Sequence, residues 1–211
     1  MSELFVLTER PSVYLASKSE RRQELLRQLG VEFEVLLLRE APGRRRDVVE
    51  RPRKDEMPLD FVKRMAHTKA AVGWHRMGQR GLAPKPVVGA DTEVVLDGTA
   101  VGKPVDAEAA AAMLAALSGR RHEVITAVAV RWQAHIEMAV SASHVTFRAI
   151  PKDEIERYVA TGEPFDKAGA YAIQGRAAAF VEHIEGSYSG VMGLPLYETS
   201  EILSRIGFPV L

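Results

Sequence analysis

An acid and a base stand at the two ends of the stretch GADTEVVLDGTAVGKP, which runs from Gly89 to Pro104. Asp91 follows the apolar run VVGA, so we expect it at a strand end, where open α/β sheets place their ligands. Lys103 follows Gly102, and a glycine lets the backbone come close to a bound group. A carboxylate and an ammonium in these places could activate a water and hold an anion, although a capping aspartate and a surface lysine fit the same spacing.

The segment GTAVGKP does not match the nucleotide-binding P-loop. Three residues separate its glycines where the P-loop has four, and Pro104 stands where the P-loop needs Ser or Thr. Asp97-Gly98 is instead a favoured two-residue turn between strands. We therefore expect a β-hairpin here, with Asp91 and Lys103 at its two ends.

A second group of polar residues lies in LASKSERR, where a strand is expected to run into a helix. Ser17 and Ser19 can donate hydrogen bonds at the start of this helix, whose free N–H groups favour anions. Arg21 and Arg22 add positive charge in the first turn, which disfavours the helix itself by about 0.3–1 kcal/mol each. A bound phosphate would offset that cost. The alternative is a solvated arginine pair on an ordinary amphipathic helix.

The side chains available for metal binding are mainly carboxylates. The chain has no cysteine, which excludes a disulfide scaffold, a thiolate zinc site and a cysteine nucleophile. Its six histidines show no metal-binding spacing. A metal would therefore be held by oxygens, which favours Mg²⁺ or Mn²⁺ on carboxylates and substrate phosphates. Asp91 and Glu40 are the carboxylates expected at strand ends, and they are the candidate ligands.

Charge and composition narrow the class of protein. Lys plus Arg and Asp plus Glu number 28 each in 211 residues, so no global field would recruit nucleic acid or an acidic membrane. Acids interleave the basic run GRRRDVVERPRK, which favours a solvated loop over a nucleic-acid site. No signal peptide is visible, and no run reaches the roughly 18 apolar residues of a membrane span. We expect a soluble cytoplasmic protein with no membrane partner and no stable nucleic-acid partner.

Hydrophobic periodicity predicts alternating strands and helices around these residues. Strands are expected over residues 13–17, 33–38, 87–91, 94–96, 122–132, 138–150 and 177–186, with 33–38 largely buried. Helices are expected over residues 19–30, 59–77, 106–119, 151–162 and 194–207, with Asp106 as an N-cap. Residues 39–58 and the glycine-rich stretch 163–175 are expected to be loops. This order indicates an α/β sheet that ends in an antiparallel pair.

Five motifs in order resemble the Maf family of nucleoside triphosphate pyrophosphatases. They are LASKSERRQELL, GADTEVVLDGTAVGKP, SGRRHEVIT, EPFDKAGAYAIQG and GLPLYE, and together they span residues 15–198. The resemblance implies one domain over residues 1–211 and an elongated mixed central sheet flanked by helices. It also implies two lobes with a nucleotide cleft between them, as in inosine triphosphate pyrophosphatases, and a homodimer.

The resemblance further implies an activity and a set of site residues. The activity is hydrolysis of a nucleoside triphosphate to the monophosphate and pyrophosphate, with a divalent metal cation. Asp91 matches the catalytic aspartate, expected to act as base for the attacking water and to touch the metal. The family's acidic position after the second strand falls on Glu40. Four further residues match its phosphate-binding serine and its cationic positions: Ser17, Arg22, Lys69 and Lys103.

Within the family, DKAGAY followed by IQG resembles the branch that prefers dTTP and UTP. In that branch, positions matching Arg22, Thr92 and Gln174 are linked to substrate preference. A glutamine amide offers a donor and an acceptor, which can match the N3–H and O4 edge of uracil or thymine. Two alternatives stay open: the branch that acts on 7-methyl-GTP, and a regulator of cell division that senses nucleotides without hydrolysing them.

The sequence departs from the family pattern at three places. Glu20 stands where the family has proline at the helix start, and an acid in the first turn is also favourable. Glu93 replaces an apolar residue and adds an acid close to Asp91. The loop over residues 41–58 is longer than in the family.

Overall fold

The computed structural model describes residues 12–39 and 46–210, and within them seven strands form one sheet. The strands are β1 (Ser12–Leu15), β2 (Glu32–Val35), β3 (Val87–Leu96), β4 (Thr99–Ala100), β5 (Arg121–Trp132), β6 (His135–Phe147) and β7 (Val181–Glu185). Their order is β2-β1-β3-β5-β6-β7, with β4 paired to β3. β1 is parallel to β2 and β3, whereas β3, β5, β6 and β7 pair antiparallel. The expected mixed α/β sheet is confirmed.

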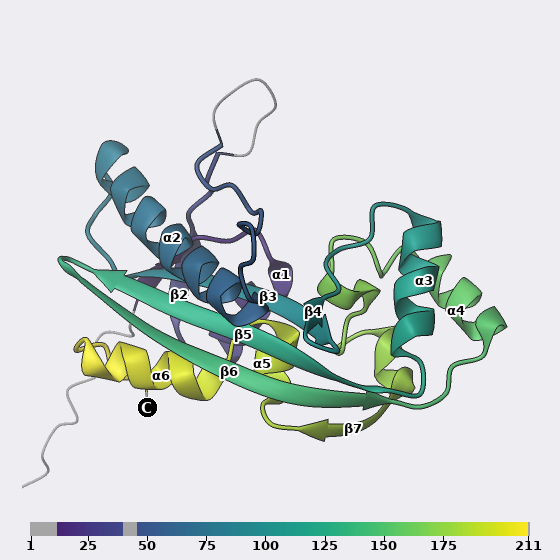
Figure 1. Ribbon diagram of the computed structural model, residues 1–211. Coiled ribbons are helices and arrows are strands. Elements are labelled where there is room, and N and C mark those ends of the chain that lie inside the picture. The colour runs from purple at the N-terminus through teal and green to yellow at the C-terminus, as the bar shows by residue number, and fades with distance from the viewer. Residues whose placement is uncertain (1–11, 40–45, 211) are drawn as a thin grey trace, which may run out of the picture.

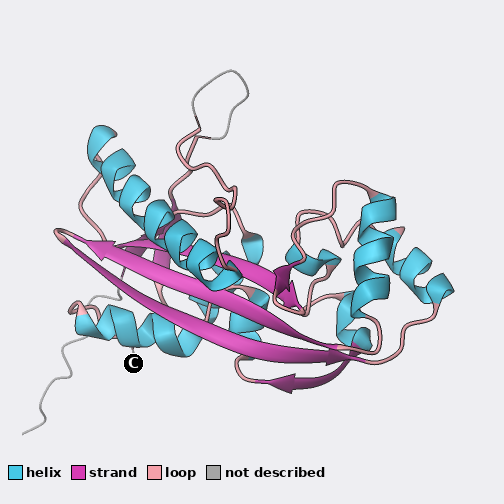
Figure 2. Cartoon of the chain, in the orientation of Figure 1, coloured by secondary structure: helices cyan, strands magenta, loops and turns pink. Residues whose placement is uncertain are grey.

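Helices cover both faces of this sheet and gather at one end of it. The α-helices are α1 (Glu20–Gln28), α2 (Pro58–Gln79), α3 (Ala107–Leu117), α4 (Lys152–Val159), α5 (Tyr188–Met192) and α6 (Leu196–Arg205); two 3₁₀ turns are η1 (Ala168–Ala170) and η2 (Arg176–Phe180). Figure 1 shows α2 across one face and α6 across the other. Figure 2 shows α3 and α4 beside short helical turns at the end of the long strands. We call α3 and residues 152–180, which include α4, η1 and η2, the small lobe, and the rest the large lobe.

Burial of apolar side chains joins these elements. The main core runs through both lobes, since it includes Leu15 of β1, Leu114 of α3, Tyr158 of α4 and Ile202 of α6. A separate apolar layer under α2 attaches that helix to β3 and β5. Each fully buried side chain of this size contributes about 1.5–3 kcal/mol. Among the described residues, no helix has the length and apolar character needed to cross a membrane.

α2 approaches the sheet closely at Gly89 of β3. A Cβ atom built on Gly89 would lie 2.5 Å from the backbone nitrogen of Ala70 and 2.6 Å from the carbonyl oxygen of Ala66. Only glycine fits at this distance. The close approach brings the side chain of Lys69 on α2 beside Asp91 on β3.

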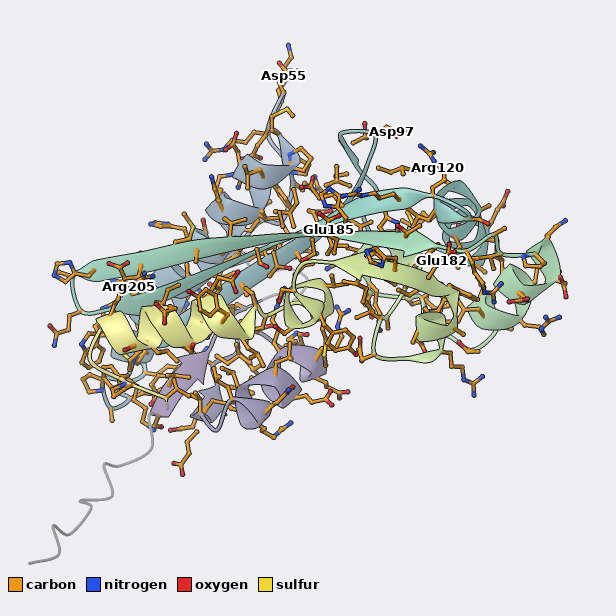
Figure 3. All side chains as sticks on the ribbon, turned by 90° about the horizontal axis from the view of Figure 1, so that it is seen from below. Asp55, Asp97, Arg120, Glu182, Glu185 and Arg205 are labelled. Carbon is orange, nitrogen blue, oxygen red and sulfur yellow. The ribbon has the colours of Figure 1, made fainter. Side chains whose placement is uncertain are left out.

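The Asp-Gly hairpin forms as the sequence predicts. Asp97 and Gly98 have φ of 49° and 76°, the positive values that a tight two-residue turn requires. Arg120, just before β5, binds both carboxylate oxygens of Asp97 at 2.8 Å, and Figure 3 shows the two side chains close together. Beyond β4 the chain leads through Lys103 into α3, whose N-cap is Asp106, as expected.

Four expectations about the elements were wrong. Asp91 is not at a strand end, because β3 continues through it to Leu96 and Asp91 pairs with Ala127 of β5 in the middle of the ladder. Residues 33–38 are not a largely buried strand, because β2 ends at Val35 and lies at the sheet edge with only β1 beside it. The first part of 177–186 is the turn η2, and only β7 is strand. The short helix α5 was not expected.

Candidate active site

A cleft of about 1120 Å³ lies where the large lobe meets the small lobe. Its walls come from the turn between β1 and α1, from α2, from β3 and the segment after β4, and from residues 166–174. More basic than acidic side chains line it. The basic residues are Lys18, Arg21, Arg22, Arg39, Arg46, Lys69, Lys103 and Lys167, and the acidic ones are Glu20, Glu50, Asp91, Glu93 and Asp166. A chain with no net charge thus concentrates positive charge in this cleft, which favours an anionic ligand.

Asp91 and Lys69 form a buried ion pair in the wall of this cleft. The Lys69 Nζ atom donates to Asp91 Oδ1 over 2.6 Å, and each residue is 8% exposed. The pair exists because α2 meets β3 at Gly89, two residues before Asp91. Since buried charges need partners, the ion pair offsets part of the cost of burying the two groups.

Glu50 completes this cluster, and sequence reasoning missed it. Its Oε1 lies 2.6 Å from Lys69 Nζ, and its Oε2 lies 3.9 Å from Lys103 Nζ. Burial would raise the pKa of the Glu50 carboxyl, but the charge and hydrogen bond of Lys69 lower that pKa below its usual value. The sequence places Glu50 in a mixed-charge run without periodicity, and we interpreted the acids there as solvated. Nothing in the local pattern sets Glu50 apart from its neighbours.

Arg22 is held by three hydrogen bonds to three different segments. Its Nε donates to the Gly193 carbonyl over 2.7 Å, its Nη1 to Ser17 Oγ over 3.3 Å, and its Nη2 to Thr92 Oγ1 over 3.2 Å. Burial lowers the pKa of this guanidinium, and the negative charge of Asp91 opposes that effect. Sequence reasoning named Ser17, Arg22 and Thr92 separately, and the structure brings them together.

Thr126 on β5 extends this network and was not expected. Its Oγ1 donates to the Gly190 carbonyl over 2.7 Å and lies 2.9 Å from Thr92 Oγ1. A hydroxyl has one proton, so Thr92 must donate to Thr126 and accept from Arg22. The hydrogen bonds therefore run in one direction, from Arg22 through Thr92 and Thr126 to the start of α5. Thr126 is fully buried, and its place in a strand carries no sequence signal of this role.

Two further cations face the cleft without a carboxylate partner. Neither Arg21 nor Lys167 forms an ion pair within residues 12–39 and 46–210. Burial, followed by repulsion from Arg22, lowers the pKa of Arg21 to about 10. Burial and then Arg21 lower the pKa of Lys167. A bound anion would stabilise these two partly buried cations.

Glu93, two residues beyond Asp91 on the same strand, is an acid with an unusual environment. Its Oε2 atom is buried and has no hydrogen-bond partner in the described part of the chain. Burial, with a contribution from the Asp91 charge, raises the pKa of Glu93 to about 7. The extra acid noted in the sequence therefore lies at the cleft, where burial favours its protonated form.

Of the three remaining predicted site residues, two lie at the cleft. Lys103 and Gln174 line the cleft, Gln174 from the small-lobe side. Glu40 lies outside the described residues, so its assignment as a metal ligand stays a prediction. No group of three or more His, Cys, Asp or Glu side chains within the described residues is arranged to hold a metal. Asp91 and Glu50 do share one ammonium, which leaves this trio with a net negative charge and suits a hard divalent cation.

Comparison with known proteins defines the class. Residues 12–206 match the family described as Maf-like protein, so the chain belongs to that family. A protein of Nitrosomonas europaea is 54% identical over 198 residues, covering 94% of this chain and 96% of the relative. One of Cupriavidus metallidurans is 55% identical over 195 residues, covering 92% and 96%. Both relatives are named dTTP/UTP pyrophosphatase.

Among solved structures, the Staphylococcus aureus Ham1 protein is similar with a TM-score of 0.38 and 13% sequence identity. The match covers 64% of this chain and 71% of the Ham1 chain. A likeness this partial adds nothing to the description of the site.

Proposed function

We propose that this protein hydrolyses nucleoside triphosphates, dTTP and UTP above others, to the monophosphate and pyrophosphate. One observation carries the proposal: the buried Asp91–Lys69 pair lies in the wall of a cation-lined cleft. The names of the relatives support it, since proteins about half identical over nearly the whole chain are dTTP/UTP pyrophosphatases.

Asp91 would act as the general base. A water attacks the α-phosphorus, its proton passes to the Asp91 carboxylate, and the bond from the α-phosphorus to the bridging oxygen breaks. Pyrophosphate leaves with the electrons of that bond. The hydrogen bond from Lys69 to Oδ1 fixes the carboxylate in one orientation, which is the main requirement for a base.

The cations would neutralise the triphosphate. Phosphoryl transfer depends mostly on positioning and on stabilising charge, because the protein forms no bond to phosphorus. Arg22 has an immobilised guanidinium, held by Gly193, Ser17 and Thr92. Lys103 is more exposed and reaches the site from the hairpin. We assign phosphate binding to Ser17, Arg22, Lys69 and Lys103.

A divalent cation fits this donor set, and we propose that Mg²⁺ or Mn²⁺ takes part. Asp91 and Glu50 would hold it together with phosphate oxygens, because carboxylates are the ligands that hard cations prefer. When bound, such an ion makes a coordinated water more acidic and balances phosphate charge. Glu50 joins Glu40 among the proposed metal ligands because it is bonded to Lys69, which also binds Asp91.

Preference for the base would come from Gln174, at the small-lobe side of the cleft. Its amide can donate to O4 and accept from N3–H of uracil or thymine. Thr92 is bonded to Arg22 and acts at the phosphate end. We further propose that residues 1–211 work as one domain in a cytoplasmic homodimer.

The test is pyrophosphate release by the wild type from dTTP, UTP, CTP, GTP and 7-methyl-GTP, each with Mg²⁺, Mn²⁺ or a chelator. The proposal expects the fastest turnover with dTTP and UTP, lost on chelation. Turnover of 7-methyl-GTP alone would assign the protein to the branch of the family that acts on 7-methyl-GTP. If the folded protein hydrolyses nothing, the proposal is wrong and a nucleotide-sensing role stands.

A further inference from the structure

The residue assigned to base preference, Gln174, lies in a turn that two other side chains hold. The turn runs from Ala172 to Ala177 and is closed by a hydrogen bond of 3.0 Å from the Gly175 nitrogen to the Ala172 carbonyl. Gln174 is exposed at its tip and lines the cleft. The position of the Gln174 side chain therefore depends on how firmly the backbone of this turn is held.

The turn is attached at both ends to Tyr158 and Glu163. The backbone nitrogen of Ala172 donates to Tyr158 Oη over 3.3 Å, and Tyr158 Oη donates to Glu163 Oε1 over 2.9 Å. On the other side of Gln174, the nitrogen of Arg176 donates to Glu163 Oε2 over 3.1 Å. The nitrogen of Ala177 donates to Glu163 Oε1 over 3.4 Å. A phenol and a carboxylate thus connect the residues before and after Gln174.

Gly175 shows how closely the turn wraps around this carboxylate. A Cβ atom built on Gly175 would lie 2.4 Å from Glu163 Oε1 and 2.7 Å from Glu163 Oε2. The Glu163 carboxylate therefore occupies the space that a side chain at position 175 would need. The IQG motif has its glycine here because the turn must sit on Glu163.

Tyr158 and Glu163 are themselves held by ring packing and by hydrogen bonds. Tyr158 lies on α4, is 4% exposed, and packs edge-on against Phe180 with ring centroids 5.2 Å apart. After α4, Thr161 Oγ1 donates to the Tyr158 carbonyl and accepts from the Glu163 nitrogen, over 2.6 Å and 3.2 Å. Burial and the Glu163 carboxylate raise the pKa of the Tyr158 phenol, so it keeps its proton to donate.

We propose that Tyr158 and Glu163 are positioning residues that set the choice of base by holding the Gln174 turn. This inference rests on the proposed function, and it concerns triphosphates of pyrimidines that carry an N3–H, against cytidine triphosphate. An amide that turns over presents donor and acceptor in reverse and then fits cytosine. Selection of uracil or thymine therefore needs a glutamine amide with a fixed position and a fixed orientation, and a backbone that does not move provides the fixed position. Neither Tyr158 nor Glu163 has to touch the nucleotide.

The experiment compares kcat and KM for UTP and CTP in the wild type, Tyr158→Phe, Glu163→Gln and Arg157→Ala. Tyr158→Phe removes the hydroxyl that joins Ala172 to Glu163 and keeps the packed ring. Glu163→Gln places an amide NH₂ against a backbone N–H, which breaks one link and preserves the volume. Arg157→Ala is the control, because Arg157 is on α4 and, within the described part of the chain, pairs only with the exposed Asp153.

We expect the ratio of kcat/KM for UTP to that for CTP to fall about tenfold in Tyr158→Phe and Glu163→Gln, since a misplaced hydrogen-bonding group loses discrimination. The fall should come mainly from a higher KM for UTP, with kcat within about threefold of the wild type. Arg157→Ala should match the wild type. Amide hydrogen exchange should quicken at residues 172–177 in the two variants and nowhere on β3.

The outcomes separate the two proposals. An unchanged UTP to CTP ratio in active, folded variants overturns this inference and leaves the proposed function intact. Equal loss of turnover with both nucleotides also overturns it, because that result indicates general damage. If the wild type hydrolyses no triphosphate, the proposed function fails, and the base-selection role fails with it. Hydrogen exchange would then report only whether the two side chains hold the turn.

Discussion

The two sides of the cleft are built in different ways. On the large-lobe side, Lys69 bonds Asp91 across 22 residues of chain, Arg22 bonds Thr92 across 70, and Arg22 bonds Gly193 across 171. On the small-lobe side, Tyr158 and Glu163 bond each other and the Gln174 turn across 5 to 14 residues. Long-range contacts form only with the whole fold, whereas short-range ones belong to a local unit that can open separately.

This difference indicates that the two sides of the cleft have separate roles. Groups that would act on the triphosphate are fixed by the sheet and share its stability. The group that would choose the base sits on a turn that can change without disturbing the sheet. Substitutions on the large-lobe side should reduce turnover of every nucleotide, whereas substitutions on the small-lobe side should change the ranking of nucleotides.

The largest effect should come from Lys69→Met. The change leaves Asp91 and Glu50 facing each other without a cation and removes one phosphate contact. We expect kcat for UTP to fall about 10²–10³-fold, as for other electrostatic stabilisers, with CTP affected equally. The matched control is Lys63→Met, on the same helix but away from this cleft. Kinetics of Lys69→Met within threefold of the wild type would remove Lys69 from the site.

Gly89→Ala should disrupt the Lys69–Asp91 pair on the large-lobe side through a change in packing alone. The new methyl group would overlap backbone atoms of Ala66 and Ala70, so α2 must shift away from β3. Overpacking of this kind costs about 1–3 kcal/mol, and the shift also separates Lys69 from Asp91. Urea denaturation measures the first effect and UTP turnover the second. Gly78→Ala in α2, with open space around its Cβ, should be neutral or stabilising.

Thr126→Val tests whether the buried hydroxyl chain positions Arg22. Valine keeps the shape but leaves the Gly190 carbonyl without this donor and Thr92 without its acceptor. We expect about a tenfold fall in kcat/KM, as for a lost hydrogen bond to a buried group, equal for UTP and CTP. Thr126→Ser should restore most of the activity. If Thr126→Val keeps the activity of the wild type, the hydroxyl chain does not position Arg22.

The smallest expected effect is on the pH dependence of folding stability, and it comes from Glu93. Because the pKa of Glu93 is about 7 in the folded protein and about 4.3 in an unfolded chain, the folded state holds more protons between these values. Its stability must therefore fall as pH rises from about 4.5 to 7 and level off above. Glu93→Gln removes this slope. Denaturation midpoints of both proteins from pH 5 to 8 should diverge with rising pH, and parallel curves would refute the assignment.

Part of the large-lobe side could be predicted from the sequence, because Ser17 and Arg22 lie where a strand leads into a helix start. Asp91 and Thr92 stand in a motif that marked them, but they lie inside β3 and not at the strand end that we expected. Lys69 lies on a helix whose apolar spacing was clear. Their meeting in one cleft required the observed sheet order and the contact at Gly89, which no local pattern encodes.

Glu50 and Thr126 could not be predicted, and the reasons differ. Glu50 follows a segment without periodicity, and a single carboxylate there looks solvated until the loop folds back to Lys69. Thr126 looks like an ordinary β-branched strand residue, and its role depends on Gly190, 64 residues later in the chain. The 3₁₀ turn at residues 176–180 was interpreted as strand because alanines and Phe180 fit either period.

The most direct test of the account is pyrophosphate release from UTP by Asp91→Asn, with UTP affinity measured alongside by equilibrium dialysis. Asparagine has the same shape and can still accept the Lys69 hydrogen bond, so the fold and the cleft should persist. We predict affinity within about threefold of the wild type and kcat lower by at least about 10²-fold. Retained turnover with unchanged affinity would contradict the claim that Asp91 is the base.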